Sequence, residues 1–158
     1  MFPKRTQGQD AARRLEQGSP LRRMLSMVLW GDAAEATLGR RGERAAASFL
    51  RRRGFKVLKR NLRLTTGEID ILCRSADGRA VVIVEVKTRL ARPGEDRRPP
   101  PEASITAHKR VKLLQLAREV RARREYTGLG VRIDVVAVDW PATGRPSIRY
   151  YENAVTGN

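Results

Sequence analysis

The chain has 158 residues, of which 41% are hydrophobic and 32% are charged, a composition typical of a globular protein rather than a disordered one. Its 33 Lys and Arg residues against 17 Asp and Glu residues give a net charge of +16, which attracts polyanions, nucleic acid before anionic lipid. One cysteine and one histidine exclude an internal disulfide and a zinc site built from several Cys or His ligands.

Residues 1–34 are expected to form a basic, flexible extension, because residues 1–20 are polar and are interrupted by glycine and proline. Residues 21–30 could form one or two amphipathic turns that dock on the domain or contact a membrane or a partner. They are too short, and lie behind too many polar residues, to be a signal peptide. Since no apolar run approaches the roughly 18 residues that span a bilayer, we expect a cytoplasmic protein without an integral membrane segment.

Residues 35–158 are expected to form one domain, which opens with a helix over about 36–52. Ala46, Phe49 and Leu50 recur there at helical spacing, and Gly54 is placed to end the helix.

Three strands are then predicted, at about 55–64, 68–73 and 80–88. Asp77 and Gly78 predict a tight two-residue turn between the second and the third strand. The third strand is apolar on both faces, which is typical of the centre of a sheet.

A proline-rich loop is predicted at 90–101, followed by a second helix that begins near Ser104 or Thr106 and runs to about 124. Two more strands are expected at 131–138 and 147–151. The order of elements predicts an α/β fold with a mixed sheet of about five strands, flanked by two main helices on one or both faces.

Acidic residues occupy positions where strands seldom carry them. Asp70 lies between two isoleucines, and Glu85 and Lys87 lie in the most hydrophobic strand of the chain. Burying such charges without partners costs several kcal/mol each, so they need either a partner or a function.

The predicted turn sets Asp70 and Glu85 opposite each other, because both lie equally far from Asp77 and Gly78. Their Cβ atoms would then be about 5 Å apart, although a bulge or a longer turn would change this register. Two carboxylates at that spacing repel each other unless a cation lies between them, and oxygen ligands favour Mg²⁺ or Mn²⁺ over zinc. The alternative is a salt bridge to Lys87, which leaves one carboxylate over.

Glu43 is a third candidate acid. Helical spacing places it at the edge of the face that carries Ala46 and Leu50, directed toward the sheet. The alternative is a surface glutamate that is favoured near the start of a helix.

Several short motifs in this order resemble the YraN-like family, a bacterial group also called uncharacterised protein family 0102 and assigned to the PD-(D/E)XK nuclease superfamily. The motifs are Gly42-Glu43-x-Ala45-Ala46, Gly54-Phe55, Arg60-Asn61-x-Arg63, Gly67-Glu68-Ile69-Asp70, Val84-Glu85-Val86-Lys87-Thr88-Arg89, Lys109-Arg110 and Arg132-Ile133-Asp134-Val135-Val136. The resemblance covers about residues 38–138, and it implies a restriction-endonuclease-like fold similar to that of the archaeal Holliday-junction resolvases.

The resemblance also implies roles for the acidic residues. Asp70 and Glu85 would bind Mg²⁺ (or Mn²⁺) directly, and the backbone carbonyl of Val86 would be a further ligand. Glu43 would bind through water or at a second metal, and Lys87 would orient or activate the attacking water.

Two positions depart from the family pattern: Ile69 replaces the proline of the superfamily's name, and Leu62 stands where many relatives carry an aromatic residue. Two further acids have open roles: Glu68 is either a hydrogen-bond acceptor beside the site or an exposed residue, and Asp134 is expected to pair with a neighbouring arginine.

Basic residues that flank the site segments are candidates for phosphate contacts. They are Arg60, Arg63, Arg89, Lys109, Arg110 and Lys112.

Together these features predict a metal-dependent endonuclease that hydrolyses phosphodiester bonds in DNA, including branched or structured DNA, with DNA favoured over RNA. The alternative is a nucleic-acid-binding protein that keeps the nuclease fold without cutting. Two-fold substrates favour symmetric enzymes, and related resolvases act as dimers, which leaves a homodimer open.

Overall fold

The protein is seen here in a computed structural model that describes residues 37–91 and 105–157. The predictions for the extension at 1–34, for its segment at 21–30 and for most of the loop at 90–101 concern residues outside this part. In the described part, no helix is long and apolar enough to cross a membrane.

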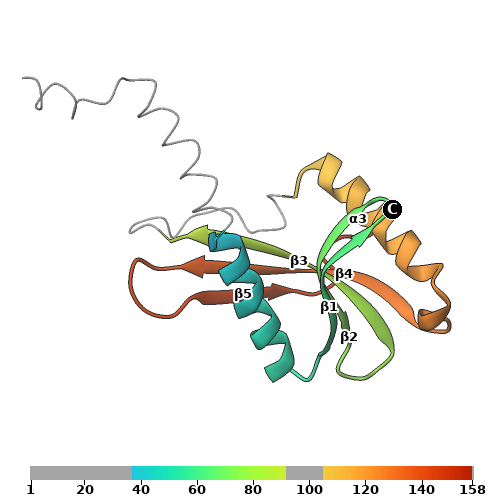
Figure 1. Ribbon diagram of the computed structural model, residues 1–158, viewed down its shortest axis with the longest axis horizontal. Helices are drawn as coiled ribbons and strands as arrows, with labels where there is room; N and C mark the ends of the chain where they lie inside the picture. The colour runs from blue at the N-terminus through green and yellow to red at the C-terminus, as the bar shows by residue number, and fades with distance from the viewer. Residues whose placement is uncertain (1–36, 92–104, 158) are drawn as a thin grey trace, which may run out of the picture. The chain divides into compact units, whose positions relative to one another are not determined.

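The described chain begins in a helix (residues 37–52) and continues through three strands, β1 (Lys56–Leu64), β2 (Gly67–Arg74) and β3 (Ala80–Leu90) (Figure 1). Helix α3 (Ala107–Arg121), a 3-10 turn (Arg124–Tyr126) and strands β4 (Gly130–Trp140) and β5 (Ser147–Tyr151) follow. The predicted α/β fold with five strands and two main helices is therefore confirmed.

The five strands form one mixed sheet in the order β1-β2-β3-β4-β5. The β1–β2, β2–β3 and β4–β5 pairs are antiparallel, whereas β3 and β4 are parallel, which requires a crossover between them. Helix α3 lies within that crossover. Strand β3 is at the centre of the sheet, as its continuous apolar run predicts.

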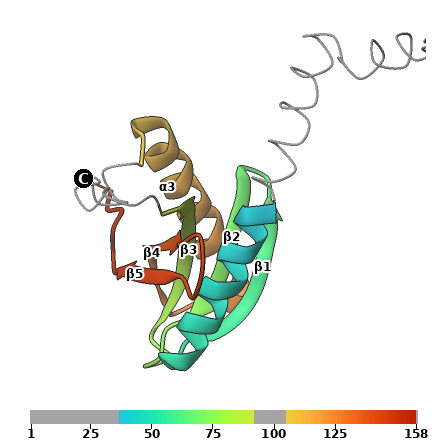
Figure 2. The same cartoon turned by 90° about the vertical axis from the view of Figure 1, so that its left-hand side faces the viewer.

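The two helices cover opposite faces of the sheet, as Figure 2 shows. Ala46, Ala47 and Leu50 of the 37–52 helix pack with Val82 and Val84 of β3. Leu113, Leu116 and Val120 of α3 pack on the other face with Val81 and Ile83. The alternation of β3 side chains therefore separates two hydrophobic cores.

The turn between β2 and β3 is longer than predicted, so the expected two-residue hairpin is wrong. Residues 75–79 join the strands, and the Ser75 N–H donates to the carbonyl of Ala80 at 2.9 Å. The longer loop is still centred on Asp77 and Gly78, and the strands pair Arg74 with Val81 and Ile71 with Val84. The predicted register is thus confirmed despite the different turn.

The β1–β2 hairpin bends where β2 leaves β3. Ile71 packs in the core under the 37–52 helix, whereas Ile69, two residues away, packs in the core under α3. At the same level of β1, Asn61 has a left-handed φ of 48°, and it lies opposite Asp70 between the pairs Arg60–Ile71 and Leu62–Ile69. The strand face therefore changes at Asp70, and this brings groups from both faces of the sheet toward one place.

The 37–52 helix approaches β3 unusually closely at Gly42. A Cβ atom at this position would lie 1.7 Å from Thr88 Oγ1 and 2.7 Å from Thr88 Cβ. Because glycine alone fits, it allows the helix to approach the strand beside the segment that carries Glu85 and Lys87.

Candidate functional site

The candidate site lies at the fork where β2 separates from β3. Paired register between the two strands ends at Ile71 and Val84, and Asp70 and Glu85 stand one step further along. Asp70 bridges the fork, because its Oδ2 atom accepts a hydrogen bond from the Val86 N–H at 2.7 Å. The two carboxylates expected to face each other thus lie at the same level of neighbouring strands.

Burial and the nearby charge of Glu85 raise the pKa of Asp70 from its ordinary value of 3.8 to about 6. The hydrogen bond from Val86 and the charge of Lys109 oppose this rise, whereas Glu43 adds a further small increase. Three acids that belong to three different elements are therefore close enough to act on one another electrostatically.

Two lysines hold the Glu85 carboxylate, whose side chain is 5% exposed. Lys87 Nζ lies 3.0 Å from Oε1, and Lys109 Nζ of α3 lies 2.8 Å from Oε2. The salt bridge to Lys87 that the sequence offered as an alternative is present. Lys109 was predicted to contact phosphate, and the structure places its ammonium group against Glu85, where its charge also lowers the pKa of Asp70.

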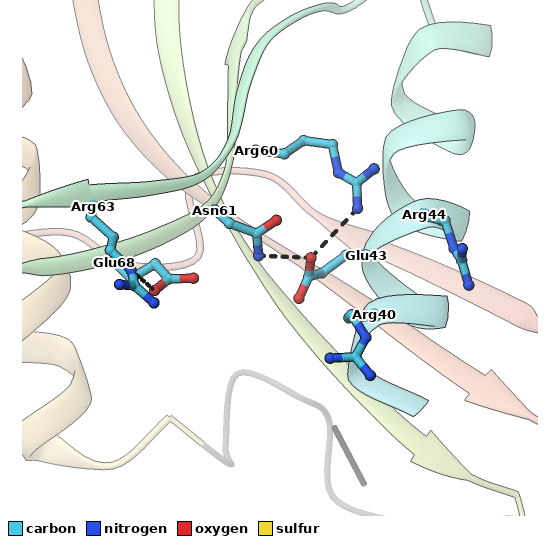
Figure 3. Close-up of a pocket in the computed structure, with 7 residues that line it drawn as sticks. All are labelled: Arg40, Glu43, Arg44, Arg60, Asn61, Arg63 and Glu68. Atoms are coloured by element: carbon cyan, nitrogen blue, oxygen red, sulfur yellow. Dashed lines mark hydrogen bonds and ion pairs between the residues drawn. The ribbon is translucent and has the colours of Figure 1, made fainter. Parts of the chain in front are cut away.

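Glu43 reaches this region from the 37–52 helix. Its Oε2 atom accepts a hydrogen bond from Asn61 Nδ2 at 2.9 Å and lies 3.6 Å from Arg60 Nη2 (Figure 3). Adjacent residues of a strand normally point to opposite faces. The left-handed backbone of Asn61 breaks this alternation, so that both side chains contact the same carboxylate.

Sequence reasoning gave Asn61 no role. The available signal was its residue type, since asparagine tolerates the left-handed conformation better than other residues with a Cβ atom. Asn61 connects Glu43 with the level of the sheet at which Asp70 lies.

The acidic side chains of the site can be compared with the ligands that Mg²⁺ or Mn²⁺ takes in proteins. Within residues 37–91 and 105–157, no three His, Cys, Asp or Glu side chains form a ready-made metal cluster. Asp70 and Glu85 nevertheless supply two carboxylates with oxygen donors, and Mg²⁺ is often bound through one or two carboxylates together with waters and substrate phosphate. The residues present therefore fit a hard divalent cation, with Glu43 held apart by Asn61 and Arg60.

A cavity of about 470 Å³ opens beside Glu43, between the 37–52 helix and the β1–β2 hairpin (Figure 3). Its lining is mainly charged, and consists of Arg40, Glu43, Arg44, Arg60, Asn61, Arg63 and Glu68. Glu68, whose role the sequence left open, pairs here with Arg63 at 3.3 Å.

The other residues predicted to contact phosphate lie elsewhere. Arg89 pairs with Asp139 of β4, which also binds Arg149 at 2.7 Å. Lys112 lies beside the β1–β2 turn, where its Cε atom would be 2.8 Å from a Cβ added to Gly67. Arg110 is exposed on α3. The six predicted basic residues therefore do not form one cluster.

Asp134 is structural, as expected. It is fully buried, and Arg132 Nε lies 3.2 Å from its Oδ1 atom. The Tyr150 hydroxyl and the Asn153 N–H also donate to its carboxylate. Although burial raises the pKa of Asp134, these donors account for its placement without a functional role.

The model of the Uncharacterised protein family UPF0102 matches residues 42–138. A relative from Rhodopirellula baltica is 38% identical over 122 residues, which cover 75% of this chain and 70% of that protein. A relative from Symbiobacterium thermophilum is 39% identical over 117 residues, which cover 74% of this chain and 94% of that protein. Both are described as UPF0102 proteins.

Among solved structures, a repair endonuclease from Pyrococcus abyssi aligns with a TM-score of 0.35 and 23% sequence identity. The alignment covers 58% of this chain and 32% of the endonuclease, so the chain spans about a third of that protein.

Proposed function

This chain belongs to the uncharacterised protein family UPF0102, and from its site we propose that it is a metal-dependent endonuclease that hydrolyses phosphodiester bonds in DNA. The observation that carries the proposal is the pair of carboxylates at the fork between β2 and β3, half-buried Asp70 and buried Glu85, with two lysines beside Glu85. Placing two carboxylates side by side out of solvent is costly, and here two lysines and the Val86 N–H offset part of that cost.

Asp70 and Glu85 would hold Mg²⁺ or Mn²⁺, with the Val86 carbonyl as a further ligand. Glu43, which Asn61 and Arg60 engage, would bind through water or at a second metal. A bound ion would stabilise charge on the phosphate oxygens and lower the pKa of a water molecule.

The lysines have distinct roles in this proposal. Lys87, whose Nζ lies 3.0 Å from Glu85 Oε1, would orient or activate the attacking water. Lys109 keeps the Glu85 carboxylate in place from α3 and balances the charge of the acids. Asn61 orients Glu43 from the opposite side.

The test is cleavage of single-stranded, duplex and branched DNA, with the corresponding RNAs, in Mg²⁺ or Mn²⁺. Wild type is compared with Asp70→Asn and Glu85→Gln. Glu125→Gln serves as the control because it removes one exposed acid outside the site. We expect each site variant to lose at least about 100-fold in rate and the control to cut normally. Unchanged cutting by both site variants would exclude the assigned site.

A second candidate is a nucleic-acid-binding protein that does not cut. It is favoured by the two ammonium groups that already hold Glu85 and by the incomplete three-acid set. Calorimetry separates the two functions, because DNA binding without Mn²⁺ binding supports the second. Sedimentation with a branched substrate tests whether the chain acts as a homodimer, which the sequence leaves open.

A further inference from the structure

The cavity beside Glu43 has the charge pattern of an anion site. Two of its arginines, Arg40 and Arg44, come from the 37–52 helix, and two, Arg60 and Arg63, come from β1. Four guanidinium groups against two carboxylates leave a net charge of +2 on the lining. Guanidinium groups on both walls can bracket a phosphate group with paired hydrogen bonds.

The dimensions of the cavity favour part of a strand over a bare ion. Its volume of about 470 Å³ is in the range of pockets that hold small organic ligands. Its mouth is open, since the side chains of Arg63 and Glu68 are 89% and 43% exposed. A polymer can therefore enter and leave without opening the domain.

The position of the cavity links it to the acids. Glu43 lines the cavity and is also electrostatically coupled to Asp70. Glu68, on the same strand, is two residues before Asp70. A phosphate seated among the arginines would thus lie beside the place where a neighbouring phosphodiester meets Asp70 and Glu85.

We propose that this arginine cavity is a second phosphate subsite, which binds a phosphate of the nucleic-acid strand next to the phosphodiester that is cut. The inference rests on the proposed function for its substrate class, and it adds Arg40 and Arg44 to the residues that contact the strand. Glu68 limits its affinity, because it pairs with Arg63 and repels the ligand.

The experiment measures binding of a fluorescent oligonucleotide to the full chain in EDTA, over a series of salt concentrations. The variants Arg40→Gln and Arg63→Gln remove one guanidinium from each wall. Arg52→Gln is the matched control, because Arg52 lies on the same helix outside the cavity and bonds to Ser48. Thermal melting verifies that each variant is folded.

We expect each cavity variant to bind about 3–10-fold more weakly, and its salt dependence to fall by about one phosphate contact. Glu68→Gln should bind more tightly than wild type, a gain that misfolding cannot produce. Wild-type affinity in Arg40→Gln and Arg63→Gln, or weaker binding by Glu68→Gln, would overturn the subsite.

Oligonucleotides with and without a 5′-phosphate identify the source of the phosphate. A preference for the phosphorylated end that Arg63→Gln abolishes assigns a terminal group, whereas equal binding assigns an internal phosphodiester.

The cleavage assay with Asp70→Asn is independent of this result. Loss of binding by the cavity variants without any cutting by wild type would retain the subsite and reject the nuclease.

Discussion

At the fork between β2 and β3, the fold keeps Asp70 in surroundings that destabilise its ionised form. Asp70 is half-buried near Glu85, and the Val86 N–H and the charge of Lys109 partly offset the cost of its charge. Its pKa of about 6, against an ordinary value of 3.8, means that the folded protein favours the neutral carboxyl more than the unfolded chain does. An acid that costs stability is a common property of functional sites.

We predict that Asp70→Asn stabilises the protein at pH 8 in EDTA, by about 1–3 kcal/mol. The unfolded carboxyl ionises near 3.8 and the folded one near 6, so wild type loses stability as the pH rises through this interval. Asparagine does not titrate and can still accept the Val86 N–H. Urea unfolding from pH 4 to pH 8 checks this, and a stability difference that grows toward low pH would contradict it.

A second prediction separates the backbone of Asn61 from its amide. Asn61→Gly keeps the left-handed backbone but loses the donor to Glu43, so cutting should slow while stability changes little. Asn61→Ala should lose the same activity and about 1 kcal/mol of stability in addition. Activity assays and urea unfolding measure the two effects. Full activity in Asn61→Gly would remove its positioning role.

At the scale of elements, the site depends on how closely the 37–52 helix approaches β3. Glu43 follows Gly42, and the missing Cβ of Gly42 is what leaves room for Thr88. A displaced helix would carry Glu43 away from Asn61. The contact between these two elements therefore controls both stability and site geometry.

We predict that Gly42→Ala destabilises the fold by about 1–3 kcal/mol, because the new methyl group would overlap Thr88. Gly39 is the matched control, since a Cβ there meets nothing within 4 Å. Gly39→Ala should stabilise the same helix by up to about 1 kcal/mol through helix propensity. Equal effects of the two changes in urea unfolding would contradict the close approach.

Sequence patterns predicted the order of the elements because the periods of apolar residues are local properties. They also predicted the register of β2 and β3, because a loop centred on Asp77 and Gly78 preserves the pairing whether it is short or long. The acids Asp70 and Glu85 stood out because charges are unusual in apolar strands.

The contacts that the sequence did not predict depend on tertiary structure. Local sequence does not show that Lys109 of α3 reaches Glu85, because the contact depends on how α3 packs against the sheet. The link from Glu43 to Asn61 requires a backbone conformation that periodicity does not encode. Arg89 was predicted to contact phosphate, but it pairs with Asp139, which also binds Arg149. The sequence did not show this pairing, because it did not define which strands are neighbours in this part of the sheet.

At the scale of the whole molecule, the sequence carries a net charge of +16, and the described part of the chain contains a small group of acids around Asp70 and Glu85. The positive field attracts nucleic acid, whereas Asp70 and Glu85 provide a local negative potential for a cation. In the proposed nuclease, substrate and ion would thus be attracted by charges of opposite sign.

We predict that Mn²⁺ raises the melting temperature of wild type but not that of Asp70→Asn. An ion at 100 times its Kd that binds the folded state alone stabilises it by about 2.7 kcal/mol. Differential scanning calorimetry at pH 7.5 with and without Mn²⁺ measures the shift. Equal shifts in both proteins would place the ion elsewhere.

The thiol of Cys73 has a consequence of its own. It is fully buried on β2 between β1 and β3, its pKa is raised to about 12 by burial, and it is the single cysteine of the chain. Because Cys73 belongs to the core that Ala46, Ala47 and Leu50 of the 37–52 helix cover, a maleimide can react with it once this core opens. Its labelling rate therefore reports, without any engineered probe, how often the core under the 37–52 helix opens.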